Sequence, residues 1–361
     1  MSELSIPQAA GQVIIAGFDG TKEAPHALSH RAKRGELGGY VLFKRNLGTM
    51  QEVAELNANL ITASMPEMPL CISLDQEGGR VARLQAPVVK LPPMQKMGAL
   101  GDAKLTRRAA FILGTQLRAL GFNMDYAPVL DINTNPANPV IGDRAFGSDP
   151  ETVTTHALAF ANGLRESMVL ACGKHFPGHG DTELDSHLAL PKLGHDRARL
   201  DRVELAPFRA AVAHLPSIMT AHVIFESLDP GVPATLSHRV ITGLLRGELG
   251  YKGVIISDDL EMKAVADHYQ TGDSACRAIE AGCDALLICS KPELVVQAQD
   301  ALIARASKDT AFASRLHDAA QRFIKARLTA RPEPITDAEL LASALDNNDT
   351  RSFQSDLNAR L

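Results

Sequence analysis

Short apolar runs alternate with amphipathic stretches of helix length along most of this chain. The apolar runs are continuous and rich in Val, Ile and Leu, as expected for parallel strands that are covered on both faces. We predict strands over Val13–Gly17, Gly39–Phe43, Leu70–Leu74, Met124–Leu130, Val169–Gly173, Ser217–Ala221, Gly253–Ser257 and Ala285–Cys289. The spacing of apolar residues between them predicts helices over Met50–Ser64, Leu105–Leu120, Glu151–Arg165, Glu204–His214, His238–Glu248 and Ser274–Ala281.

Strands that alternate with helices in this way predict an α/β fold built from βα units. About eight such units close a single (β/α)8 TIM-type barrel, which we expect over residues 1–330. Residues 331–361 lose strand character and become polar, so we expect a C-terminal helical extension or a partly disordered tail. The alternative fold is a doubly wound open sheet, but no GxGxxG turn follows the first strand.

Polar clusters follow six of the predicted strands. Chemistry in such barrels takes place at the C-terminal ends of the strands. The clusters are Phe18-Asp19-Gly20, Lys44-Arg45-Asn46, Asp75-Gln76-Glu77, Lys174-His175, His222 and Ser257-Asp258-Asp259. Any strand can end in a polar turn, but six together favour a functional site at one end of the barrel.

Composition narrows the class of protein. The 361 residues are 45% hydrophobic and 22% charged, with a net charge of −5. We expect no nucleic-acid partner because there is no basic stripe, and no membrane span because no run of about 18 apolar residues exists. The N-terminus carries no secretory signal pattern. The five cysteines lack CxxC spacing, which indicates reduced thiols rather than a disulfide frame or structural zinc.

Residues 174–187 carry three histidines and three acids within fourteen positions. Pro177, Gly178 and Gly180 make a helix improbable there. One hypothesis for this segment is a metal-dependent hydrolase. It requires five side chains to meet at one metal ion: His175, His179, Asp181, Asp185 and His187.

The other hypothesis for this segment is proton transfer. Asp185 and His187 are two residues apart, so both side chains can face one way in an extended turn. The carboxylate would hold one imidazole nitrogen and favour the charged ring, while the other nitrogen exchanges a proton. We expect His179 to be a polar residue that holds the loop in place.

Two further segments carry candidate site residues. Asp258 follows an apolar strand directly, so it is either a nucleophile at the barrel mouth or, with Asp259, a helix cap. Asp75 and Arg83 flank a Gly-Gly pair and suit a polyhydroxylated ligand; the alternative is a surface ion pair.

A long loop after the fourth predicted strand contains Arg144, which we predict to be a ligand clamp. The alternative is a salt bridge from Arg144 to Asp143 or Asp149.

Several of these motifs together resemble glycoside hydrolase family 3, and within it the bacterial β-N-acetylglucosaminidases of peptidoglycan recycling. The resemblance covers roughly residues 10–330. Its motifs are Lys174-His175-Phe176-Pro177-Gly178-His179-Gly180, Asp185-Ser186-His187, Asp75-Gln76-Glu77-Gly78-Gly79-Arg80 and Ser257-Asp258-Asp259-Leu260.

The resemblance implies a role for each matching residue. Asp258 matches the nucleophile, His187 the acid/base and Asp185 the partner of that histidine. The positions that hold the terminal N-acetylglucosamine are matched by Asp75, Arg83, Arg144, Lys174 and His175.

The resemblance also implies the substrate and the setting. It implies a cytoplasmic retaining enzyme without a cofactor that acts on N-acetylglucosamine linked β-1,4 to 1,6-anhydro-N-acetylmuramic acid, with or without peptide. The chain has no Trp and four Tyr, which favours a small pocket for one terminal sugar over a long polysaccharide groove. We expect a monomer. A β-glucosidase, an N-acetylglucosaminide phosphorylase or a non-catalytic sugar-binding protein are the alternatives on the same fold.

Overall fold

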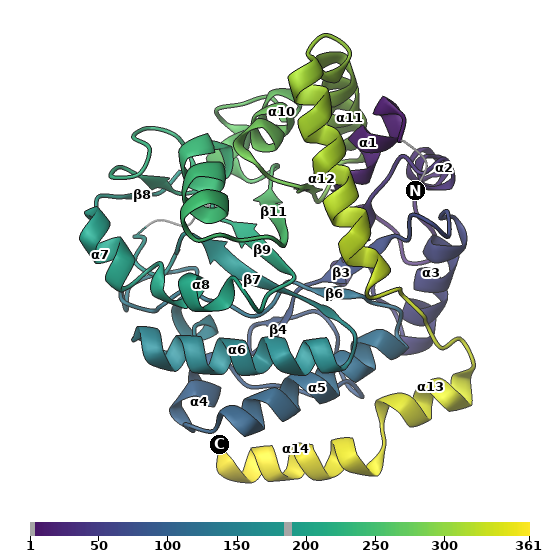
Figure 1. The fold of residues 1–361 in the computed structure, drawn as a ribbon. Helices are drawn as coiled ribbons and strands as arrows, with labels where there is room; N and C mark the ends of the chain where they lie inside the picture. The colour runs from purple at the N-terminus through teal and green to yellow at the C-terminus, as the bar shows by residue number, and fades with distance from the viewer. Residues whose placement is uncertain (1–3, 184–189) are drawn as a thin grey trace.

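The computed structural model describes residues 4–183 and 190–361, and its centre is a closed barrel of parallel strands (Figure 1). The strands neighbour one another in the order β1-β12-β11-β9-β7-β6-β3-β2. Their bounds are β1 Ile14–Ala16, β2 Gly39–Val41, β3 Cys71–Leu74, β6 Met124–Asp125, β7 Leu170–Phe176, β9 Ser217–Thr220, β11 Val254–Asp259 and β12 Ala285–Ile288. The predicted (β/α)8 barrel is confirmed, and each predicted strand is present.

Helices surround the barrel. They are α1 Ile6–Gln12, α2 His26–Lys33, α3 Met50–Thr62, α4 Met94–Ala99, α5 Ala103–Ala119, α6 Pro150–Glu166, α7 Arg197–Arg202, α8 Ala206–Ala211, α9 Lys263–Ala266, α10 Thr271–Ala281, α11 Pro292–Ala306 and α12 Thr310–Leu328, with a π-helix at Arg239–Glu248. Side-chain caps start several of them: Thr49 accepts the Glu52 N–H at α3, and Asp149 accepts the Thr152 N–H at α6. The described part of the chain contains no helix of the length and apolarity that a bilayer span requires.

Short elements connect these units at the rim. An antiparallel pair, β4 (Gln76–Gly78) and β5 (Val81–Ala82), follows β3, and a parallel pair joins β8 (Lys192–Leu193) to β10 (Ile224–Phe225). Single 3-10 turns occur at Lys44–Asn46, Gly142–Arg144 and Ala234–Leu236.

Two strands run further than their apolar residues predict. β7 continues through Lys174 and His175 to Phe176, and β11 continues through Asp258 to Asp259. A shift in register overlaps each extension, between Gly173 and Phe176 in β7 and between Ile256 and Asp259 in β11. Irregular pairing of this kind redirects side chains beside functional sites. The polar residues that were predicted to follow these two strands therefore belong to the strands and to the barrel wall.

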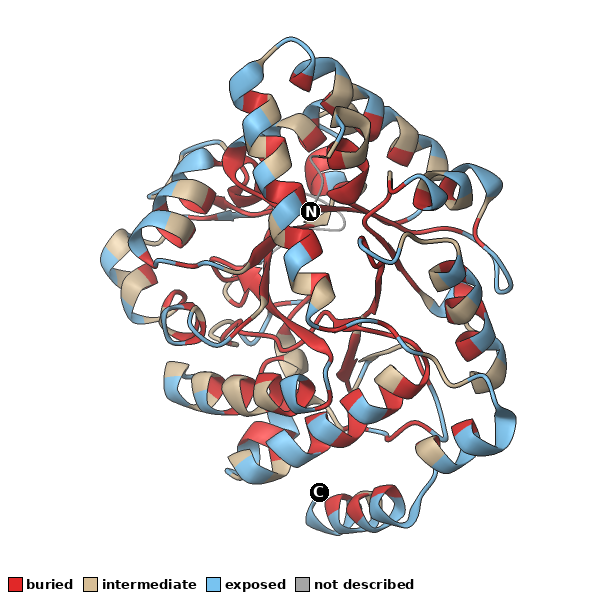
Figure 2. Cartoon of the chain, turned by 45° about the vertical axis from the view of Figure 1, so that its right-hand side comes forward, coloured by how far each residue is buried: buried red, intermediate tan, exposed pale blue. Residues whose placement is uncertain are grey.

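Buried residues lie along the barrel strands and on the helix faces turned toward them (Figure 2). Apolar side chains form two large clusters, one inside the barrel and one between the strands and the helices. The interior cluster includes Ile15, Met124 and Leu287, and Phe323 of α12 closes it at the N-terminal end of the strands. There the fully buried Arg327 donates to the Gln12 Oε1 atom at 2.6 Å and to the Gly38 carbonyl. All five cysteines are free thiols, and four of them are buried, as expected.

Residues 331–361 contain two helices, α13 (Ala338–Leu345) and α14 (Asn348–Arg360), which lie along the outside of α5 (Figure 1). Gln116 of α5 donates to the Leu345 carbonyl at 2.5 Å, and Phe353 and Leu357 are buried in the main core. This segment is therefore packed on the barrel through apolar contacts.

A buried carboxylate before β12 gives a test of the barrel's ionic framework. Asp284 is fully buried and pairs with Arg246, Arg315 and Arg322. Asp284→Asn should lower the free energy of unfolding by about 3 kcal/mol, because it removes the buried anion that the three arginines share and leaves Arg246 without a carboxylate partner. Denaturant unfolding measures the change.

The matched control is Asp318→Asn. Asp318 pairs with Arg315 and Arg322 as well, but its side chain is 55% exposed. Exposed ion pairs contribute no more than about 1 kcal/mol. Equal decreases in the free energy of unfolding of the two variants would show that burial gives Asp284 no larger contribution than Asp318.

Candidate active site

A cavity of about 310 Å³ opens at the C-terminal ends of the barrel strands. Its wall brings together residues that are far apart in the sequence. They are Val41, Phe43, Arg45, Asp75, Val81, Arg83, Tyr126, Val140, Arg144, Lys174, His175, His179, Met219, Asp258, Asp259, Met262, Leu287, Cys289 and Ser290. Every candidate site residue that the structure describes lines this cavity: Asp75, Arg83, Arg144, Lys174, His175 and Asp258. Asp185 and His187 lie outside the described residues.

A buried ion-pair network forms one wall of the cavity. The Lys174 Nζ atom lies 2.7 Å from the Asp75 Oδ1 atom and 2.6 Å from the Glu77 Oε1 atom. Arg144 contacts both Glu77 oxygens, at 2.7 and 2.9 Å, and Arg83 contacts the Asp75 Oδ2 atom at 3.0 Å. Two carboxylates thus alternate with three cations, so each charge has a partner.

The network sets the protonation of its members. Burial alone would raise the pKa of Glu77, but Arg144 and Lys174 outweigh burial and lower that pKa to about 2. Burial likewise opposes the charged form of Lys174, and Asp75 and Glu77 nevertheless raise its pKa. The pKa of Asp75 is lowered by Lys174 and Arg83 against the effect of burial. All three groups therefore remain charged at neutral pH.

Sequence reasoning missed Glu77. The alternative that it gave for Arg144, a salt bridge to Asp143 or Asp149, is wrong, because Arg144 forms a bidentate pair with Glu77. The predicted role of Arg144 as a ligand clamp stays a prediction. Asp143 pairs with Arg80 instead. The available signal was the position of Glu77 in the polar cluster after β3, because a carboxylate at a barrel mouth needs a cation if it is buried.

Asp131 was missed as well, and it organises the segment after β7. This fully buried carboxylate accepts the backbone N–H of His175 and, at 2.7 Å, that of His179. Its Oδ2 atom also lies 2.7 Å from the His175 Nδ1 atom. Burial opposes its charge, but His175 and the other donors lower its pKa. Asp131 therefore fixes the orientation of the His175 ring that faces the cavity.

His179 has the environment of a residue that holds a loop. Its Nδ1 atom lies 2.8 Å from the Thr182 hydroxyl, and its side chain is almost fully buried. Burial, and then His175, lower its pKa to about 4, so its ring is neutral at physiological pH.

Asp258 and Asp259 have different surroundings at the end of β11. The N–H of Asp259 donates to the Asp258 Oδ1 atom at 2.8 Å, which orients a partly buried carboxylate on the cavity wall. Asp259 accepts the N–H groups of Glu261 and Cys289. Burial, followed by Glu261 and Asp258, raises the pKa of Asp259 to about 7. Both carboxylates line the cavity, and that of Asp259 also accepts two N–H groups from the backbone.

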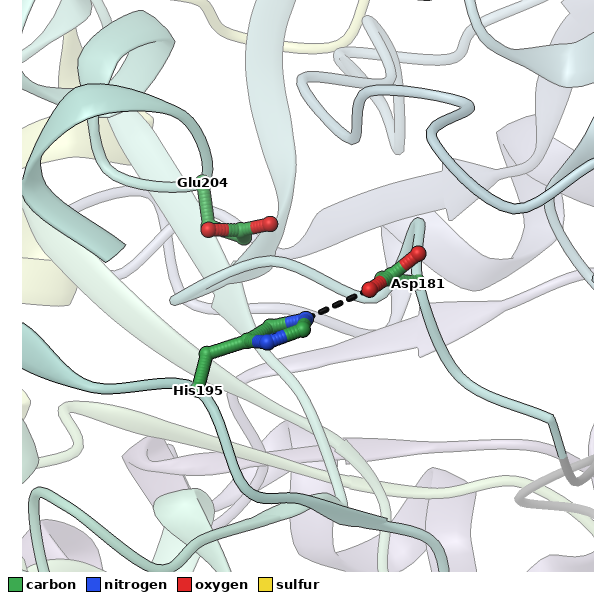
Figure 3. A group of neighbouring side chains, drawn as sticks. All are labelled: Asp181, His195 and Glu204. Atoms are coloured by element: carbon green, nitrogen blue, oxygen red, sulfur yellow. Dashed lines mark hydrogen bonds and ion pairs between the residues drawn. The ribbon is translucent and has the colours of Figure 1, made fainter. Parts of the chain in front are cut away.

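The described members of the metal hypothesis do not form a cluster of their own. Asp181 turns its carboxylate toward Thr134 and His195, while His175 and His179 are bonded to Asp131 and Thr182. Within residues 4–183 and 190–361, the group with metal-ligand spacing is Asp181, His195 and Glu204 (Figure 3).

Comparisons with known proteins agree on one family. Residues 5–326 match the model of the glycosyl hydrolase family 3 N-terminal domain. A β-hexosaminidase from Alkalilimnicola ehrlichii is 39% identical over 292 residues, which is 78% of this chain and 82% of that protein.

Solved structures give the same result. A family 3 β-N-acetylglucosaminidase from Paenibacillus superposes with a TM-score of 0.92 at 41% identity and covers 99% of this chain and 69% of its own. The NagZ protein of Neisseria gonorrhoeae, solved with N-trifluoroacetyl-D-glucosamine, has a TM-score of 0.79 at 30% identity and covers 96% of this chain and 97% of its own.

The depressed pKa of Glu77 predicts how stability depends on pH. A carboxylate with a lowered folded-state pKa stabilises the fold above its ordinary pKa of 4.5, and this contribution is lost as the pH falls toward about 2. The stability difference between the wild type and Glu77→Gln should therefore shrink by about 2 kcal/mol between about pH 7 and about pH 3. Urea unfolding at several pH values measures it.

Glu67→Gln is the control for this experiment, because Glu67 is exposed. Its difference from the wild type should stay near zero at both pH values. A constant difference for Glu77→Gln would show that Glu77 titrates normally in the folded protein.

Proposed function

The chain belongs to glycosyl hydrolase family 3 and is a glycosidase of the β-hexosaminidase type, and from this premise we propose that it is a retaining exo-β-N-acetylglucosaminidase. Its substrate is a peptidoglycan fragment, N-acetylglucosamine β-1,4-linked to 1,6-anhydro-N-acetylmuramic acid, with or without peptide. It removes the terminal N-acetylglucosamine and acts in cytoplasmic peptidoglycan recycling.

The observation that carries the proposal is that a charged wall lies opposite the Asp258 carboxylate in one cavity. Asp75, Arg83, Arg144, Lys174 and His175 share a cavity with Asp258. The volume of about 310 Å³ is at the lower end of the range for small-molecule sites, which suits a single sugar ring. This supports action at a chain end.

Charged donors and acceptors on that wall suit the hydroxyl and acetamido groups of the sugar. Lys174 and Arg144 are donors only, and the ionised Asp75 is an acceptor only, so together they fix which hydroxyl faces which group. The ion pairs hold these side chains before the sugar arrives, and such preorganisation lowers the entropic cost of binding.

The reaction proceeds by double displacement. Asp258 attacks the anomeric carbon while the imidazolium of His187 protonates the leaving oxygen, which gives a covalent glycosyl-Asp258 intermediate. Neutral His187 then removes a proton from water, and the water releases the sugar with its β configuration retained. Asp185 stabilises the charged form of His187. Asp258 is oriented for attack by the N–H of Asp259.

Sugar choice gives the first test. The enzyme should hydrolyse a chromogenic β-N-acetylglucosaminide at least about 100-fold faster, in kcat/KM, than the matching glucoside, because the loss of the acetamido contacts costs a few kcal/mol. A preference for the glucoside would contradict the proposal.

The same assay separates the remaining alternatives. Release of free sugar with and without phosphate indicates hydrolysis, whereas formation of the 1-phosphate only with phosphate would indicate a phosphorylase. Loss of activity after exhaustive chelation, in protein that stays folded, would support a metal-dependent reaction instead.

The two neighbouring aspartates provide a matched pair of variants. Asp258→Asn should lower kcat by at least about 10³-fold, since the variant lacks the nucleophile. Asp259→Asn should keep kcat within about tenfold of the wild type, because Asn preserves the carbonyl oxygen that accepts backbone N–H groups. Steady-state kinetics with both folded variants show which of the two aspartates is the nucleophile. Comparable losses would contradict the assignment of Asp258.

A further inference from the structure

We propose that Asp181, His195 and Glu204 form a zinc-binding site that is separate from the catalytic cavity. The three side chains come from separate segments and face a common gap (Figure 3). One potential ligand atom from each lies within 4.8 Å of the others. None of the three is among the described residues that line the cavity.

The donor set selects the kind of ion. One imidazole nitrogen and two carboxylate oxygens suit Zn²⁺, which accepts mixed nitrogen and oxygen ligands in a tetrahedral site. A water molecule would complete the fourth position. Mg²⁺ and Ca²⁺ prefer oxygen ligands alone, so the imidazole of His195 disfavours them.

Glu204 provides the strongest evidence that this group of side chains binds a cation. Its side chain is only 4% exposed, and its Oε2 atom has no hydrogen-bond partner among the described residues. A buried carboxylate oxygen without a partner is unfavourable, and a bound cation would satisfy it. Glu204 also packs against Gly178, where an added Cβ would lie 2.9 Å from the Glu204 Cβ. This contact limits its movement away from the gap.

Arg199 is a cation that lies beside the proposed site, but it leaves the Glu204 Oε2 atom without a hydrogen bond within the described part of the chain. Its Nη2 atom lies 3.1 Å from the Glu204 Oε1 atom and 3.8 Å from the Asp181 Oδ2 atom. One guanidinium beside two carboxylates leaves one negative charge when His195 is neutral. The Arg199 side chain is 33% exposed, so it can move toward solvent when a divalent ion enters.

Zinc would replace an existing contact between two chain segments. The His195 Nε2 atom lies 2.5 Å from the Asp181 Oδ2 atom, and Thr134 holds the other Asp181 oxygen at 2.9 Å. On binding, the Nε2 atom gives up its proton, the neutral His195 ring carries its one proton on Nδ1, and the freed Nε2 and Oδ2 atoms both contact the ion. The ion stabilises the fold and takes no part in hydrolysis.

The experiment titrates ZnCl₂ into metal-free protein and follows binding by calorimetry and thermal stability. Wild type should bind one zinc at this site with a raised Tm. His195→Gln and Glu204→Gln should each weaken binding by at least about tenfold. Arg199→Gln should strengthen it, because a competing cation is removed. An ion-pair network without a metal function predicts no such gain.

Two controls separate this site from other zinc ligands. His214→Gln removes an exposed histidine elsewhere, and Asp258→Asn removes a cavity carboxylate; both should leave zinc affinity unchanged. Unchanged affinity in His195→Gln and Glu204→Gln, or a loss in Asp258→Asn alone, would overturn the proposal.

A crystal of the wild type soaked in ZnCl₂ tests the site without any variant. An anomalous peak among Asp181, His195 and Glu204 is expected. A peak only in the catalytic cavity, or none, would overturn the proposal even if the variants fail to fold.

Discussion

The charge on Lys174 is the constraint on which the buried ion-pair network in the cavity wall depends. An ammonium group that is 2% exposed is stable only with anions in contact, and Asp75 and Glu77 provide them. These carboxylates in turn require Arg83 and Arg144. The five side chains therefore support one another, and the positions of the groups that face a ligand are set by the protein's own ion pairs.

Barrel closure places this wall opposite Asp258, the proposed nucleophile. Asp75 and Glu77 follow β3, Lys174 is on β7, and Asp258 is on β11, with β6 and β9 between these strands in the barrel order. Parallel strands that close on themselves bring their C-terminal ends to one mouth. Residues from distant parts of the sequence thus share one cavity, and the register shifts in β7 and β11 occur beside the residues that line it.

The architecture could be predicted from the sequence, because fully covered parallel strands are continuous apolar runs. The strand ends could not, since Lys174, His175, Asp258 and Asp259 are polar residues within strands. The structure brings together the described candidate residues. Glu77 and Asp131 were missed because their role is to hold other side chains, and a sequence without a fold does not show which cation a carboxylate meets. His195 and Glu204 are distant from Asp181 in the sequence, so their convergence required the fold.

The most direct test of the central claim, that Asp258 forms a covalent bond with the sugar, is mass spectrometry of the enzyme after reaction with an activated fluorinated N-acetylglucosamine donor. We predict that the intact protein gains the mass of one sugar and that the modified peptide carries it on Asp258. Turnover of the donor with label on another residue, or with inverted product and no label, would contradict the account.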